Sequence, residues 1–184
     1  DMQPTERRAD VVIRQPQPDT VWAGKQRRLR TGSDRNGGIR FRGRIGRVTR
    51  FRSRLTQAEM QKIASSDRSE SIDASQVVGC WLNPASGDSF PLKAEGFDRP
   101  ISFETWIRPA EGESGRILDK ITAGPGDGFL LDCWPKLSLR LIVGGRQADF
   151  PNVLKPDVFQ HVAIVIDGPA TTVTLDGKPL VEGK

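Results

Sequence analysis

The chain has 184 residues, of which 36% are hydrophobic and 28% are charged, and its formal net charge is +5 at pH 7. This length is enough for one well-packed core, so we expect a single domain, 1–184. No apolar run of about eighteen residues occurs, so no membrane-spanning helix is expected. The first residues lack the apolar core of a signal peptide, so any export signal is expected to lie outside this sequence.

The N-terminal third is rich in arginine. Residues 1–20 are polar and rich in proline, and we expect an extended segment there. Residues 21–25 are predicted to form a short strand, residues 26–38 a loop rich in arginine and glycine, and residues 39–51 a long extended run with a bulge at Gly46. Fifteen Lys or Arg residues fall between Arg7 and Arg54.

A short helix is predicted over 56–64. Thr56 and Glu59 have the spacing of a capping box, in which each side chain bonds the backbone N–H of the other residue. The uniformly polar residues 65–76 are expected to form a linker.

The remainder, 77–184, shows the short apolar segments and frequent turns of an all-β sandwich or barrel. In the segment 102–109, Phe103, Thr105 and Ile107 alternate with Glu104, Trp106 and Arg108, which indicates a strand with both faces in use. Asp176-Gly177 is a strong hairpin signal. The other predicted strands are 77–82, 89–92, 115–120, 128–133, 137–143, 160–167 and 171–175.

Several of these segments resemble a known family when they are taken in order. The segments 103–109, 115–120 and 128–132 are similar to the first half of a laminin G-like, concanavalin A-like domain. The segments 154–167 and 173–178, which end in an Asp-Gly-Lys turn, are similar to its second half. The resemblance implies a two-sheet antiparallel jelly-roll sandwich that usually serves as a binding module, often attached to secreted carbohydrate-active enzymes.

The arginine-rich part resembles the end of the same family rather than its beginning. Residues 22–24, 41–48 and 54–60 are similar to the family's closing strands and final helical turn, yet they precede everything else. Either the domain is circularly permuted, or the chain holds pieces of two neighbouring domains. We favour one closed, permuted domain, because a half-domain would leave an open core and an exposed sheet edge. In this account 21–64 closes the sandwich and 77–184 supplies its opening and central strands.

We predict no catalytic residue. His161 is the only histidine, so any Ser-His-Asp arrangement would need it, and its place in an apolar strand favours structural packing. The E-x-D-x-x-E strand of related glucanases is absent, and Glu111 and Glu113 are expected to be solvated loop acids.

No metal site or cofactor is predicted either. The resemblance allows calcium, with Asp119, Asp127 and Asp132 as oxygen donors, but these acids lack a recognisable ligand spacing. Cys80 and Cys133 either form a disulfide or remain two buried thiols.

Tryptophans are the candidates for sugar stacking, because an indole has an apolar face and one polar N–H. Trp134, beside a proline at a strand end, and Trp22, beside the arginine-rich loop, are expected to be exposed. Trp81 fits a core position and a ligand platform equally well, and Trp106 is expected in the core.

Arg40, Arg42 and Arg44 are predicted to line one face of a strand, where guanidinium groups can bind carboxylate, sulfate or phosphate. The alternative interpretation is a solvated basic edge. We therefore expect a non-catalytic, lectin-like carbohydrate-binding module that is secreted or periplasmic. The expected ligand is a polysaccharide or oligosaccharide, either neutral or acidic. A catalytic domain is the expected neighbour within the larger protein. The alternative function is an interaction module whose basic face docks a neighbouring domain or an acidic partner. Nucleic-acid binding is not expected, since no RRM, KH or zinc motif occurs.

Overall fold

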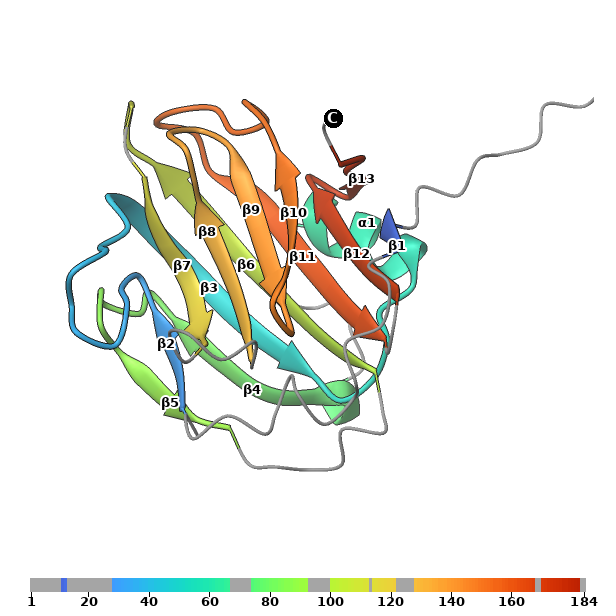
Figure 1. Ribbon diagram of the computed structural model, residues 1–184. Helices are drawn as coiled ribbons and strands as arrows, with labels where there is room; N and C mark the ends of the chain where they lie inside the picture. Colours follow the sequence, from blue (N-terminus) through green and yellow to red (C-terminus); the bar gives the residue numbers. More distant parts are fainter. Residues whose placement is uncertain are drawn as a thin grey trace, which may run out of the picture.

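The protein is a β-sandwich of two antiparallel sheets, seen in a computed structural model (Figure 1). The structure describes residues 11–12, 28–66, 74–92, 100–112, 114–121, 128–167 and 170–182. The two-sheet, all-β architecture predicted from the sequence is confirmed.

The first sheet, called sheet A, has seven strands. Their order is β1 (Val11–Val12), β12 (Ala170–Leu175), β11 (Gln160–Asp167), β6 (Ile101–Pro109), β3 (Gly43–Phe51) and β4 (Val77–Leu82), with β13 (Lys178–Pro179) paired to β12.

The second sheet, called sheet B, has six strands. Their order is β10 (Arg146–Phe150), β9 (Leu139–Val143), β8 (Phe129–Cys133), β7 (Gly115–Lys120), β2 (Arg28–Thr31) and β5 (Ser89–Pro91).

The core lies between the sheets because the strands alternate as their sequences predict. In β6, Phe103 and Ile107 point inward and are fully buried, and Phe103 packs its ring 5.0 Å from that of Phe129 in sheet B. Leu131 and Leu141 meet them from the opposite sheet. Full burial of one such side chain contributes about 1.5–3 kcal/mol, so this shared core holds the two sheets together.

The arginine-rich strand β3 lies inside sheet A, between β6 and β4 (Figure 1). Ile45 pairs with Ile107, and the register then shifts so that Arg47 pairs with Trp106. The bulge predicted at Gly46 is therefore confirmed, and β3 is an interior strand of sheet A. The family resemblance, and with it the circular permutation, stays a prediction.

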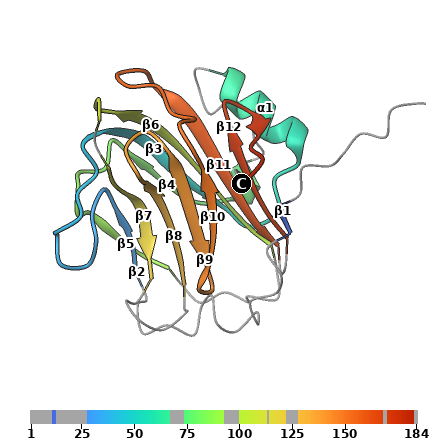
Figure 2. The same cartoon turned by 45° about the horizontal axis from the view of Figure 1, so that its top comes forward.

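One α-helix, α1 (Gln57–Ser65), occurs among the described residues. Thr56 is its N-cap and forms a capping box with Glu59, as predicted. Met60 and Ile63 pack on Ala163 of β11 in a second apolar cluster, on the face of sheet A that points away from sheet B. Figure 2 shows α1 beside β11 and β12, so the helix covers one end of this outer face.

Two parts of the sequence prediction need correction. Arg28–Thr31 is strand β2, although it was expected in a loop, and its buried Leu29 and Thr31 alternate with two arginines. Arg146–Phe150 forms β10, which was not predicted. Val11–Val12, in the segment that was expected to be extended, pairs with β12. The predicted strand at 21–25 and most of the predicted linker, 67–73, lie outside the described residues.

Candidate functional site

Trp134 is exposed and lies at the end of β8; Trp81 and Trp106, the other tryptophans that the structure describes, are half-buried. Trp134 is 47% exposed, which confirms the predicted exposure. Its backbone N–H donates to the carbonyl of Ser138 (2.8 Å), and its ring is backed by the guanidinium of Arg140, 5.4 Å from the ring centroid. The indole is therefore held in place while much of its surface faces solvent.

Arg140 is fixed in turn by Asp132. Its Nε and Nη2 donate to the two carboxylate oxygens of Asp132 at 3.0 and 2.6 Å, a fork that fits a carboxylate closely. Burial raises the pKa of Asp132 above its ordinary value, although the hydrogen bonds and charge of Arg140 oppose the rise. Asp132 thus holds the guanidinium of Arg140 in position against the ring of Trp134.

This pair belongs to a row of alternating charges on the outer face of sheet B. The strand register places Arg116 opposite Asp132, Asp132 opposite Arg140, and Arg140 opposite Asp149. Arg116 also bonds Asp119 at 2.9 Å. Opposite charges that face each other across neighbouring strands stabilise the register. This row therefore keeps the protein surface next to Trp134 polar and its side chains ordered.

The other two predicted tryptophans are placed differently. Trp81 packs partly against the main core, and one face of its ring stacks on Phe90 at a centroid distance of 4.3 Å. The ring therefore covers the edge of the core between β4 of sheet A and β5 of sheet B. Trp22 lies outside the described residues.

The three predicted arginines do not form one regular row. Arg40, Arg42 and Arg44 are all exposed, but β3 begins only at Gly43. Arg40 bridges to Arg116 of sheet B through the backbone, whereas Arg44 pairs with Arg108 of β6 in sheet A. The segment crosses from one sheet to the other, and Arg40 and Arg42 precede β3, so the prediction that the three side chains line one face of a strand is wrong for these two.

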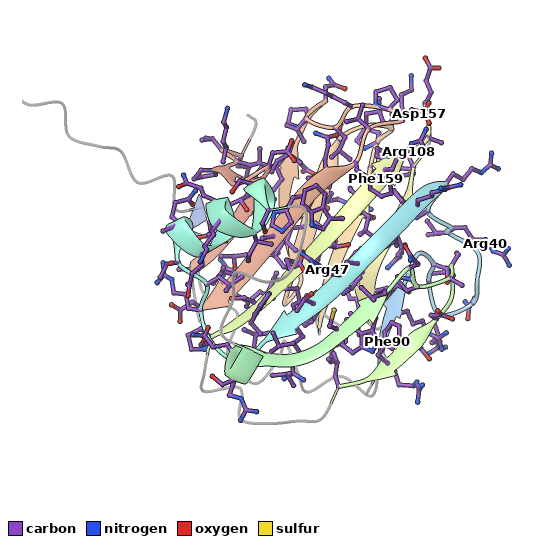
Figure 3. All side chains as sticks on the ribbon, turned by 180° about the vertical axis from the view of Figure 1, so that it is seen from behind. Arg40, Arg47, Phe90, Arg108, Asp157 and Phe159 are labelled. Carbon is purple, nitrogen blue, oxygen red and sulfur yellow. The ribbon has the colours of Figure 1, made fainter. Side chains whose placement is uncertain are left out.

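Arg44 instead joins two residues that the sequence analysis did not single out. Arg44 and Arg108 lie directly opposite each other on the outer face of sheet A, since their neighbours Ile45 and Ile107 point into the core. Phe159, 44% exposed, lies against Gly46. Figure 3 shows Arg108 and Phe159 together near one end of sheet A, and Arg40 at the side of the molecule.

The middle of the same face carries a buried polar cluster. Glu104 is 1% exposed; its Oε1 accepts from Arg47 Nε at 2.7 Å, and its Oε2 lies 3.2 Å from His161 Nε2. Burial on its own would raise the pKa of Glu104, but the hydrogen bond from His161 and the charge of Arg47 outweigh it and hold that pKa below its ordinary value. The carboxylate is therefore ionised and shared between two neighbours.

His161 is locked by this arrangement. An ionised Glu104 requires His161 to donate from Nε2, and Nδ1 has no hydrogen-bond partner among the described residues. The ring is fully buried and lies 5.3 Å from that of Trp106. A histidine without access to solvent supports the packing role predicted from the sequence.

Trp106 itself corrects a prediction. It was expected in the core, but it is half-buried on the outer face of sheet A, on the opposite side of β6 from Phe103. Together Trp106 and Phe159 border Gly46 from two sides.

The cysteines do not form a disulfide. Cys80 is exposed on β4 of sheet A, whereas Cys133 is buried on β8 of sheet B. Burial raises the pKa of Cys133 to about 12, so its thiol is protonated at neutral pH.

Neither a metal cluster nor a membrane helix is present in the part of the chain that the structure describes. No group of three or more His, Cys, Asp or Glu side chains is placed to hold a metal ion there. Within the same residues, no helix combines the length and apolar character of a membrane span.

The residues that sequence reasoning missed are Arg108, Arg140 and Phe159. Alternation in 102–109 already placed Arg108 on the non-core face, so that signal was available. The partners of Arg140 and Phe159 depend on strand register, which the sequence does not contain locally. Comparison with family models, curated proteins and solved structures finds no match to this chain.

Proposed function

We propose that this protein is a non-catalytic carbohydrate-binding module, carried by a larger secreted carbohydrate-active protein, and that Trp134 is its main contact with the sugar. The observation that carries the proposal is an indole that is 47% exposed and yet backed by a cation. A pyranose has an apolar face of C–H groups that such a ring can cover, while the indole N–H stays available for a hydroxyl.

The setting of Trp134 supports this role. A ring already backed by Arg140 loses little conformational freedom when a ligand arrives. On the same face of sheet B, Gln147 Nε2 donates to Asp149 Oδ2 at 2.8 Å, and these two side chains offer donors and acceptors for sugar hydroxyls. Arg140 links this pair to the tryptophan, because it faces Asp149 across β9 and β10.

The test is retention of the full chain on immobilised glycans, with Trp134→Ala as the variant. We expect the variant to bind about tenfold more weakly, because one stacked aromatic contact contributes on the order of 1.4 kcal/mol. Leu82→Ala is the matched control, since Leu82 is also a large exposed apolar side chain, 72% exposed, on the other sheet. Equal retention of wild type and Trp134→Ala on every glycan that binds would refute the role of Trp134.

A second candidate function is an interaction module that docks an acidic partner. Exposed apolar side chains beside cations favour it: Val158 and Phe159 are 49% and 44% exposed, close to Arg108. Such docking predicts binding that weakens steeply with salt, and an acidic polypeptide is therefore included in the experiment below.

A further inference from the structure

A pair of like charges faces outward on sheet A. Arg44 and Arg108 are directly opposed across β3 and β6, an arrangement that is unfavourable unless an anion relieves it. The guanidinium of Arg44 has no ion-pair or hydrogen-bond partner among the described residues. Arg108 Nε donates to the backbone carbonyl of Asp157 at 2.9 Å, and its Nη2 lies 3.5 Å from the Asp157 carboxylate, which is 68% exposed and strongly screened.

The nearest buried acid does not neutralise this pair. Glu104 lies on the same face of β6, but its two oxygens are engaged by Arg47 and His161. Among the described residues, Asp157 is then the acid whose carboxylate pairs with either arginine, so these residues give this end of the face a net positive charge.

An aromatic ring lies next to the two cations. Gln160 pairs with Ile107, so extending the register by one residue places Phe159 beside Arg108. The ring leans across β6 to β3, where a Cβ added at Gly46 would be 3.3 Å from Phe159 Cε1. The missing side chain at Gly46 thus leaves room for the ring to rest on the sheet, with 44% of the residue exposed.

We propose that Arg44, Arg108 and Phe159 form a second binding site, which takes a sulfate or carboxylate group on an acidic glycan. Directly opposed residues have Cβ atoms about 5 Å apart, so both guanidinium groups can donate to one anionic group. Phe159 then supplies an apolar surface for the sugar ring that carries it. The identification of the ligand as a glycan rests on the proposed carbohydrate-binding function. The location of the second site and its preference for an anionic group do not.

The position of the site favours a glycan over an acidic peptide. Extended peptides commonly bind by adding a strand to a free sheet edge. Here β6 lies between β11 and β3 and has no free edge, whereas β4 pairs with β3 only from Arg47 to Phe51. Arg44, Arg108 and Phe159 project from the face of sheet A, so a ligand that contacts all three lies across that face, where cations with an aromatic ring suit an acidic sugar.

The experiment measures the affinity of the full chain for four soluble probes: heparin, polygalacturonate, neutral dextran and poly-glutamate. Arg44→Gln is the main variant, because the Arg44 guanidinium has no partner among the described residues, and Arg108→Gln and Phe159→Ala accompany it. Arg52→Gln is the matched control, since Arg52 is exposed beyond the other end of β3 and its loss changes the net charge equally. Thermal unfolding of each variant verifies that the protein is folded.

We expect Arg44→Gln to weaken binding of an acidic glycan at least tenfold and to flatten its salt dependence, with Arg52→Gln near wild type. Binding of heparin alone would identify sulfate as the ligand group, and binding of polygalacturonate alone or of both probes would identify carboxylate. Equal losses in Arg44→Gln and Arg52→Gln would overturn the site, because only the overall charge would then matter. Binding of poly-glutamate in preference to both glycans would overturn the ligand class.

Trp134→Ala separates this site from the proposed function. Acidic-glycan binding that is lost in Arg44→Gln and kept in Trp134→Ala supports the second site, whatever becomes of Trp134. Acidic-glycan binding that is lost in Trp134→Ala and kept in Arg44→Gln overturns the second site and leaves carbohydrate binding in place. If no acidic probe binds the wild type, the second site is refuted.

Discussion

Replacing Glu104 by Gln tests the buried cluster that supports the outer face of sheet A. The change keeps the shape of the side chain but removes the charge that Arg47 and His161 share. Removing one partner of a buried ion pair costs about 3–5 kcal/mol, because the other charge remains without compensation. Arg47 retains a side-chain exposure of 12%, so we expect the lower end, about 3 kcal/mol. For a chain of this size that corresponds to a fall in Tm of about 6–12 °C.

The lowered pKa of Glu104 also predicts how the stability difference between wild type and Glu104→Gln changes with pH. Because the folded-state pKa of Glu104 lies below its ordinary value, ionised Glu104 stabilises the fold above the unfolded pKa, which is about 4.3. This stabilisation is lost as the pH falls through the folded pKa, where the carboxyl becomes neutral like the amide. The gap between wild type and Glu104→Gln should therefore be constant from pH 7 to about pH 5 and close in stronger acid.

Urea unfolding followed by tryptophan fluorescence measures this gap. Asp157→Asn is the control, since it removes one negative charge from a side chain that is 68% exposed and should change the unfolding free energy by less than about 0.5 kcal/mol. Asn also tolerates the positive φ of 56° at that position. A loss below about 1 kcal/mol for Glu104→Gln at pH 7, or a gap that persists unchanged in acid, would refute the reasoning.

Two further predictions concern the helix and the thiols. Thr56→Ala removes the N-cap that accepts from the N–H of Glu59 at 3.2 Å, and it should lower the unfolding free energy by about 1 kcal/mol in the same urea titration. Thr56→Ser is the control and should keep most of the stability. Equal losses in both variants would argue against the capping role. In the native protein a thiol reagent should modify exposed Cys80 at once and Cys133 only after unfolding, since burial raises the pKa of Cys133 to about 12. Rapid reaction of two thiols before unfolding, counted by absorbance or by mass, would contradict this.

Much of the fold could be predicted because the alternation of inward and outward residues is visible within the sequence of a single strand. In β6 the alternation of Phe103 and Ile107 with polar residues fixed both the strand and its inward face, and Thr56 with Glu59 marked the start of α1. β2 was missed because it has only four residues, two of them arginines, so its buried Leu29 looked like an isolated apolar residue in a charged loop.

The candidate sites were predictable only in part. The proline after Trp134 marked the end of a strand, and that was enough to predict an exposed indole. The Asp132–Arg140 fork beneath it depends on the register of the consecutive strands β8 and β9, and the Arg44–Arg108 opposition arises from pairing between strands that are distant in sequence. Trp106 was misplaced because a large apolar side chain suggested the core, although the alternation of β6 had already assigned it to the opposite face from Phe103.

The most direct test of the account is a glycan-binding screen of the wild-type chain and Trp134→Ala, side by side, over neutral and acidic oligosaccharides. The account predicts that the folded wild type retains at least one neutral glycan and that Trp134→Ala loses it. Retention of no glycan by correctly folded wild-type protein, neutral or acidic, would contradict the claim that this sandwich binds carbohydrate.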